Sequence, residues 1–196
     1  MKLILQSIRQ TLVWTVVTGI LYPLAMTVLF QLAFPRQANG SLIERDGKLV
    51  GSELMAQQFT GAKYFWPRPS AATYGTGPTG LNAGSGSNFG PTSAQLQTNV
   101  RANAKALRDA SKLAADAPVP ADLVYASASG VDPHISPEGA NFQISRVAAA
   151  RGMSEDQVRA LVGKFTEAPQ WGFLGQARVN VLLLNLALDA ADGRKS

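Results

Sequence analysis

The chain has 196 residues, with 18 lysines and arginines against 13 acidic residues and no cysteine. The missing cysteine excludes disulfides, thiolate metal sites and thiol catalysis, and the single histidine, His134, excludes a multi-histidine metal site. The formal net charge of +5 is scattered rather than gathered in a basic stripe, which argues against nucleic acid as a partner.

Residues 11–34 form a run of 24 positions without a charged side chain. A helix of this length reaches roughly 36 Å, enough to cross the roughly 30 Å hydrocarbon core of a bilayer. The alternative is a cleaved secretory signal, but the apolar part of a signal is usually about 7–15 residues long and precedes a small-residue cleavage pattern. Residues 35–39 lack that pattern. The run therefore predicts an uncleaved single transmembrane helix in residues 1–35, followed by one domain in residues 36–196.

The charges that flank this run predict its orientation. Lys2 and Arg9 precede it without an acidic residue, whereas residues 36–48 carry charges of both signs. The positive-inside rule then places the N-terminus in the cytoplasm and residues 36–196 in the periplasm, on a single-pass protein of the inner membrane. Without Lys2 and Arg9, the net charge of +5 falls to +3 for the outer domain.

The apolar run contains small residues at regular spacing. Thr11, Thr15 and Gly19 recur every four residues, which predicts one helix face able to approach a neighbouring helix closely. Chance spacing is the alternative, because threonine and glycine are common in spanning helices. Pro23 is expected to kink the helix.

The next segments predict short elements and one long loop. Asp46-Gly47 lies between two strand-like segments and predicts a β-hairpin over residues 41–51. Residues 53–59 are expected to form a short helix, and residues 65–70 an extended segment because of their prolines. Residues 69–100 carry no charge and are rich in glycine, serine, threonine and asparagine. They are interpreted as an ordered, shaped loop, with a flexible linker as the alternative.

The second half of the chain predicts mainly helices, because capping residues precede apolar positions at helical spacing. The domain is therefore predicted to be α+β, with helix predominating. The expected helices run from a cap at Thr92 or Ser93 to before Pro118, from Ser136 to Gly152, from the capping box Ser154–Gln157 to Phe165, and over residues 179–189. A strand is expected over residues 122–128.

The residues that carry chemistry leave alternatives open. Asp132 and His134 resemble half of a catalytic triad, which would make the protein a membrane-anchored extracytoplasmic hydrolase, but they also fit a turn before a helix cap. The helix N-terminus at Ser136 can bind an anion, so a binding domain is a further alternative. Gln143 and Arg146 are neighbours on the following helix and form either a site or a solvated face. No nucleophile elbow or phosphate-binding loop occurs.

Four segments, in this order after one N-terminal anchor, resemble KdpC, the C subunit of the bacterial Kdp potassium-transporting ATPase. The resemblance covers nearly the whole chain. The segments are FWPRPS at residues 65–70, GSNFGPT at 86–92, DPHISP at 132–137 with Gln143 and Arg146, and GFLG at 172–175 with RVNVL at 178–182.

The resemblance implies a non-catalytic accessory subunit of an ATP-driven, high-affinity potassium uptake complex. Its partners would be a potassium-translocating subunit, a P-type ATPase subunit, a small single-helix subunit and the lipid bilayer. The subunit would stabilise assembly and act as a catalytic chaperone that raises the ATP affinity of the ATPase subunit. It would have no cofactor or metal of its own, and Gln143 matches a glutamine implicated in nucleotide contact.

The predicted orientation bears on that nucleotide contact. A bilayer of about 40–45 Å, including headgroups, would separate the outer domain from cytoplasmic ATP, which favours an indirect effect. An alternative role is a lid at the outer potassium entrance. A surface that guides K⁺ toward an entrance by electrostatic attraction should be acidic, whereas this domain is net positive. The candidate partner contacts are Thr11, Thr15, Gly19, Asn88, Phe89, Asp132, His134 and Arg146.

Overall fold

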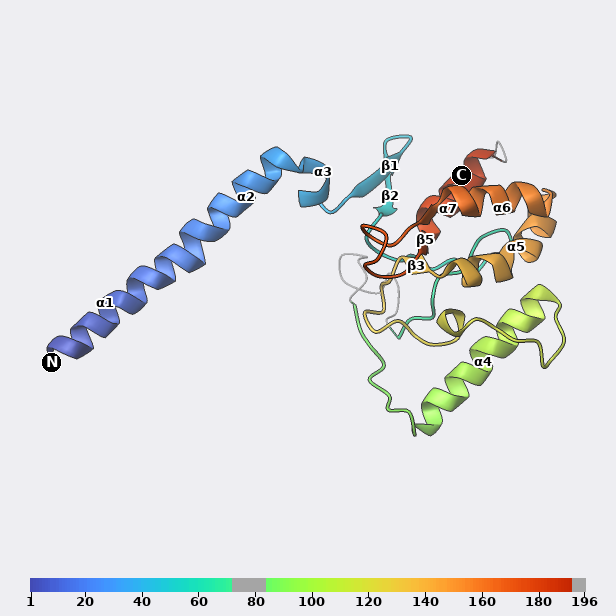
Figure 1. The fold of residues 1–196 in the computed structure, drawn as a ribbon, viewed down its shortest axis with the longest axis horizontal. Helices are drawn as coiled ribbons and strands as arrows, with labels where there is room; N and C mark the ends of the chain where they lie inside the picture. Colours follow the sequence, from blue (N-terminus) through green and yellow to red (C-terminus); the bar gives the residue numbers. More distant parts are fainter. Residues whose placement is uncertain (72–83, 192–196) are drawn as a thin grey trace. The chain divides into compact units, whose positions relative to one another are not determined.

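The computed structural model describes residues 1–71 and 84–191, and its contacts divide the chain into two compact units, Met1–Ser52 and Glu53–Ser196 (Figure 1). The predicted shaped loop therefore falls partly outside the described residues. The division into a spanning segment and an outer domain at residue 35 stays a prediction, because contacts within one chain do not define the edge of a bilayer.

The first unit begins with one continuous helix, Lys2–Ala33, made of α1 (Lys2–Val16), a π-helical turn η1 (Val17–Leu21) and α2 (Tyr22–Ala33). It is long and apolar enough to cross a membrane, and none of its residues is buried. The π turn ends at Leu21, two residues before Pro23, whose missing N–H cannot continue the regular bonding. The kink expected at Pro23 stays a prediction.

A short helix and the predicted hairpin complete the first unit. Residues after the long helix form α3 (Pro35–Ala38), and β1 (Leu42–Arg45) then pairs antiparallel with β2 (Lys48–Ser52). The two turn residues between the strands have φ angles of +52° at Asp46 and +73° at Gly47. These left-handed angles are what an Asp-Gly hairpin turn requires, so the prediction is confirmed.

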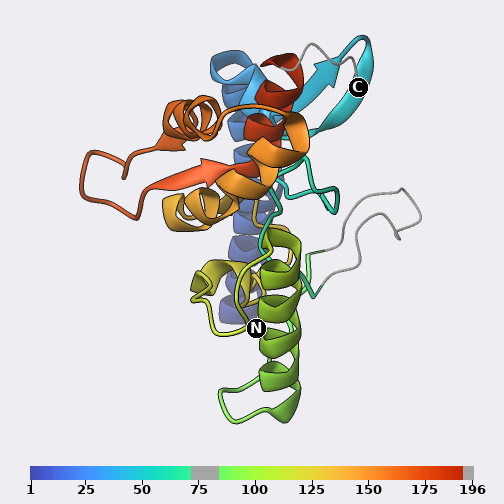
Figure 2. The same cartoon turned by 90° about the vertical axis from the view of Figure 1, so that its right-hand side faces the viewer.

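The second unit packs helices around a small antiparallel sheet with the strand order β3-β5-β4. Helices α5 and α6 contact each other, as do α6 and α7, and α4 contacts α5 (Figures 1 and 2). The elements are α4 (Ala94–Ser111), a 3₁₀ turn η2 (Ala121–Leu123), β3 (His134–Ile135), α5 (Pro137–Arg151), α6 (Glu155–Lys164), β4 (Thr166–Glu167), β5 (Arg178–Asn180) and α7 (Val181–Ala191).

The predicted caps are confirmed at three helices. The hydroxyls of Ser93, Ser136 and Ser154 accept backbone N–H groups at the starts of α4, α5 and α6, and Ser154 forms a reciprocal capping box with Gln157. Gly152 ends α5 with a φ angle of +67°. The structure thus confirms the α+β class with helix predominating.

Two predicted elements are wrong, and the helix expected over residues 179–189 begins only at Val181, because residues 179 and 180 belong to β5. Residues 53–59 form no helix, because they are bonded to distant segments: the Ala56 N–H donates to the Val131 oxygen at 2.9 Å, and the Asn180 side chain donates to the Glu53 oxygen at 2.8 Å. The strand expected over residues 122–128 is replaced by η2 and irregular chain, since Asp122 bonds to the start of α5 instead.

The core lies where one face of α5 meets α6, α7 and β5. Phe65 from the extended segment is fully buried in it, and both of its backbone polar groups bond to the Asn185 side chain, at 2.8 and 3.0 Å. The other core members with at most 2% exposure are Leu123, Ile135, Ala140, Ile144, Val147, Ala148, Val158, Val179, Val181, Leu184 and Leu188.

Candidate functional site

The N-terminus of α5 already holds a carboxylate of the same chain. Oδ2 of Asp122 accepts the backbone N–H of Ser136 at 2.7 Å, and Oγ of Ser136 accepts the N–H of Gly139 at 2.8 Å. A Cβ atom at Gly139 would lie 2.9 Å from the same carboxylate oxygen, so only glycine leaves room for it. The anion suited to this helix terminus is therefore Asp122.

Asp132 and His134 lie together in the turn before α5. Oδ1 of Asp132 accepts the backbone N–H of His134 at 3.0 Å, whereas the His134 ring nitrogen Nδ1 is 3.7 Å away, beyond hydrogen-bond distance. Oδ2 of Asp132 accepts Nη1 of Arg68 at 2.9 Å. This geometry matches the turn-and-cap interpretation.

The charge of Asp132 is firmly held by these neighbours. Burial alone would raise its pKa, but the nearby His134 ring, the His134 backbone N–H and Arg68 outweigh burial and lower the pKa to about 2. The ion pair of Asp132 with Arg68 ties the extended segment to the turn before α5. The His134 ring lies too far from Asp132 for the arrangement of a catalytic base with its orienting acid.

Gln143 lies on the inner face of α5 and is 0% exposed. Its Oε1 accepts the backbone N–H of Trp66 at 2.8 Å and Nη2 of Arg146 at 2.6 Å. Its Nε2 donates to the backbone oxygens of Trp66 at 3.2 Å and Gly139 at 3.3 Å. Both ends of the amide are engaged inside the protein, and the alternative of a solvated face is wrong.

Arg146 is a buried cation held by neutral groups. Its Nη1 donates to the backbone oxygens of Ala62 at 2.7 Å and Tyr64 at 3.0 Å. Its guanidinium carbon lies 4.3 Å from the centre of the Trp66 ring, a cation–π contact. Burial lowers the pKa of Arg146 to about 10, so the group stays charged at neutral pH. Carbonyl oxygens and an aromatic face therefore compensate this charge.

Arg151 completes the row of polar side chains on α5. Its Nε donates to the backbone oxygen of Lys63 at 2.7 Å, and its Nη2 bonds to Oδ1 of Asp189 on α7 at 2.8 Å. Both side chains of this ion pair are buried. Together Gln143, Arg146 and Arg151 hold residues 62–66, here called the clamped segment, through its main-chain atoms.

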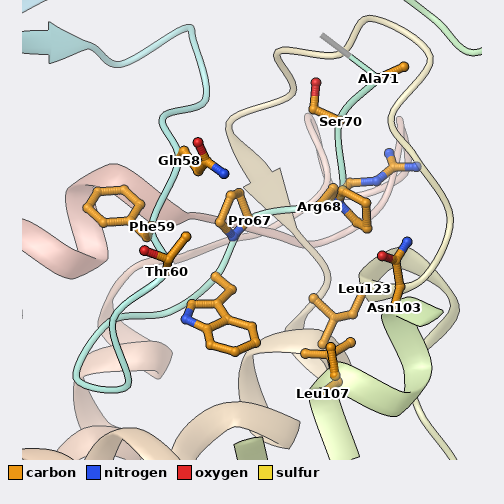
Figure 3. Close-up of a pocket in the computed structure, with 13 residues that line it drawn as sticks. Gln58, Phe59, Thr60, Pro67, Arg68, Ser70, Ala71, Asn103, Leu107 and Leu123 are labelled. Carbon is orange, nitrogen blue, oxygen red and sulfur yellow. The ribbon is translucent and has the colours of Figure 1, made fainter. Parts of the chain in front are cut away.

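A hollow of about 440 Å³ lies next to the clamped segment. Figure 3 shows Phe59 on one side of it and Leu107 and Leu123 on the other. Among the described residues that line it, Arg68 alone has a titratable side chain, and that side chain is bonded to Asp132. The hollow can receive a small group, but its described lining offers no nucleophile–base pair.

The other predicted contacts lie on separate segments. Phe89 is 41% exposed, and Asn88 has a left-handed φ of +54°. A Cβ at Gly86 would lie 2.7 Å from the Ala128 oxygen, so this end of the uncharged stretch runs close along the backbone near residue 128. On the N-terminal helix Lys2–Ala33, Thr11 and Thr15 line a shallow groove beside Trp14, Thr18 and Ser7.

Sequence reasoning missed residues whose partners are distant along the chain. No local sequence pattern predicts the contacts of four of these residues, namely Asp122, Trp66, Arg151 and Asp189. Asn185 does carry a signal, because a buried amide inside the apolar run of α7 must find a polar partner.

The comparison with known proteins covers almost the whole chain. The family described as "KdpC: K+-transporting ATPase, c chain" matches residues 4–190. The chain belongs to the KdpC family. It is 56% identical over 186 residues to the potassium-transporting ATPase KdpC subunit of Methylococcus capsulatus, which covers 94% of this chain and 95% of that protein.

Two further KdpC subunits are similarly close. The subunit of Sorangium cellulosum is 54% identical over 180 residues, 92% of this chain and 93% of that protein. The subunit of Geobacter metallireducens is 51% identical over 185 residues, 93% of this chain and 95% of that protein.

In this KdpC-family chain, a nucleotide contact by Gln143 would have to replace bonds that the fold already uses. Each amide atom of Gln143 has two partners, and the side chain is not exposed. Within residues 1–71 and 84–191, no cluster of three or more metal-binding side chains occurs.

Proposed function

We propose that this chain is a non-catalytic accessory subunit of an ATP-driven potassium uptake complex and that it stabilises the assembled transporter. The observation that carries this proposal is the match to the KdpC family over residues 4–190. The geometry of the turn before α5 supports the non-catalytic part, since Asp132 is held by Arg68 and lies too far from the His134 ring to orient it.

The proposed orientation is N-terminus in the cytoplasm and the second unit outside the inner membrane, in the periplasm. It is supported by the apolar helix Lys2–Ala33 and by the cations Lys2 and Arg9 near its start. A protease site added at the C-terminus tests it. We expect cleavage in right-side-out vesicles and protection in inverted ones, and the reverse result would contradict the orientation.

The proposed partners are a potassium-translocating subunit, a P-type ATPase subunit and a small single-helix subunit. The anchor offers them one face on which Thr11, Thr15 and Gly19 are small, and the second unit offers the exposed Phe89 with its neighbour Asn88. Close approach of helix backbones at small residues is a usual basis for association in lipid.

The proposed effect on ATP affinity is indirect. In this orientation about 40–45 Å of bilayer and headgroups separates the second unit from cytoplasmic nucleotide. The subunit then needs only to bind one conformation of the complex more tightly than another. A coupling free energy of about 1–3 kcal/mol changes ATP affinity about 5–150-fold.

Purification of the complex with and without this chain tests the function. We expect its deletion to reduce the recovery of intact complex and to lower potassium-stimulated ATPase activity. An intact pump with unchanged activity and unchanged ATP dependence would refute the proposal. Adding back a chain with the Asp132→Asn substitution serves as a control, because an accessory subunit does not need that carboxylate for chemistry, whereas a hydrolase would.

A further inference from the structure

The connection between β4 and β5, residues 168–177, presents large apolar side chains to solvent. Trp171 is 78% exposed and Phe173 74% exposed, the highest values among the large apolar side chains of the described second unit, and the next residue, Leu174, is 44% exposed. None of the ten residues is charged. Figure 2 shows this orange-red connection extending away from the helices of its unit.

The backbone of this connection is bonded to itself. Gln170 and Leu174 exchange two hydrogen bonds of 2.9 Å, and the Gly172 N–H donates to the Pro169 oxygen at 2.9 Å. Trp171 has a left-handed φ angle of +54°. The turn therefore holds its side chains outward in a defined geometry. The main obstacle to placing a loop in lipid is the free-energy cost of unpaired backbone N–H and C=O groups, and the hydrogen bonds within this turn reduce that cost.

We infer that this apolar tip, Trp171 to Leu174, inserts into the boundary between headgroups and acyl chains of the bilayer that the N-terminal helix crosses. Tryptophan is enriched at that boundary, because its ring is apolar while its N–H can bond to headgroups or water. Apolar groups there lie about 5–10 Å deep. The nearest charged residues along the chain, Glu167 and Arg178, pair with each other at the base of the connection and can stay in the aqueous region.

The covalent link to the anchor favours lipid as the occupant. The apolar helix ends at Ala33, and the second unit begins at Glu53, so roughly 20 residues connect the two. This tether keeps the tip at a high effective concentration near the lipid surface, and even a weak insertion is then populated. The inference does not depend on which subunits the chain binds.

Spin labelling of the full chain in lipid-only vesicles tests the inference. The chain has no cysteine, so Phe173→Cys gives one labelling site, and Gln97→Cys on the exposed surface of α4 gives a matched reference. We expect the nitroxide at position 173 to lose collisions with a water-soluble nickel reagent and to gain collisions with oxygen, relative to position 97. Circular dichroism verifies that each labelled variant is folded.

Two results would overturn the inference. One is equal nickel accessibility at positions 173 and 97 in lipid-only vesicles. The other is shielding of position 173 only when the other subunits are present, because a protein surface would then cover the tip. A second label, at Trp171→Cys, controls for a local effect of one substitution. Its collision rates with the nickel reagent and with oxygen should change in the same direction as those at position 173.

Discussion

Replacing Gln143 by alanine separates a structural role from direct nucleotide contact. The substitution removes the acceptor of the Trp66 N–H and of Arg146 Nη2, and the donor to the Trp66 oxygen. A residue that touches only a nucleotide would lose affinity without loss of stability. A residue that holds the clamped segment to α5 must lower the stability of the fold.

The magnitude follows from the groups left unpaired. Two buried donors, the Trp66 N–H and one N–H of Arg146, lose their acceptor, and each such loss costs about 1–3 kcal/mol. Removal of a fully buried side chain also leaves a cavity, although water that enters would repair part of the loss. A destabilisation of about 3–5 kcal/mol results, which lowers the Tm by roughly 10–15 °C for a unit of this size.

Thermal unfolding of the full chain in detergent, followed by circular dichroism, measures this effect. Gln97→Ala on the exposed surface of α4 is the matched control, and it should change stability by less than about 0.5 kcal/mol. If Gln143→Ala melts like the unchanged protein while the complex loses ATP affinity, the reasoning is refuted, and Gln143 must be accessible in another conformation.

Three further predictions follow from the described contacts. Gly19→Leu should weaken assembly of the complex in detergent more than Ala25→Leu does. Apart from its own helix backbone, a Cβ at Gly19 meets no atom of the described residues within 4 Å, so any penalty must come from a neighbouring helix; equal recovery of both complexes would remove the packing argument. Because the pKa of Asp132 is lowered to about 2, its contribution of about 1–2 kcal/mol is present above pH 4 and is lost as pH falls from about 4 to 2. Asp132→Asn should therefore be less stable at pH 7 and less sensitive to pH in that acid range, and identical acid-unfolding curves would disprove this assignment. Asp189→Ala removes the Asp189 carboxylate from the buried Arg151 and should cost about 3–5 kcal/mol in chemical denaturation, part of which a second substitution, Arg151→Met, should recover; a loss below about 1 kcal/mol would contradict the burial of this pair.

Local signals in the sequence predicted much of the fold. The helix starts at Ser93, Ser136 and Ser154 were predictable, because a capping hydroxyl and the helix it begins lie within three residues of each other. The hairpin at Asp46-Gly47 has the same local origin. The long N-terminal helix is predictable from the apolar run of residues 11–34 alone, without tertiary information.

Elements fixed by distant contacts were not predictable in this way. The strands β3, β4 and β5 have only two or three residues each, too few for an alternating pattern. The burial of Gln143 and Arg146 depends on the clamped segment, about 80 residues earlier in the chain, lying across α5. The sequence of α5 alone is therefore compatible with a solvated face as well as with a buried site.

The clamp has a consequence for how this region can vary. At Ala62 and Lys63 the α5 side chains bond only to main-chain oxygens, so the path of the chain matters there more than the side chain, whereas Trp66 also stacks its ring on Arg146 and Phe65 fills the core. Substitutions at Ala62 or Lys63 should be widely tolerated in a mutational scan. A single-residue deletion there should not be, since it would slide every main-chain acceptor out of alignment at once.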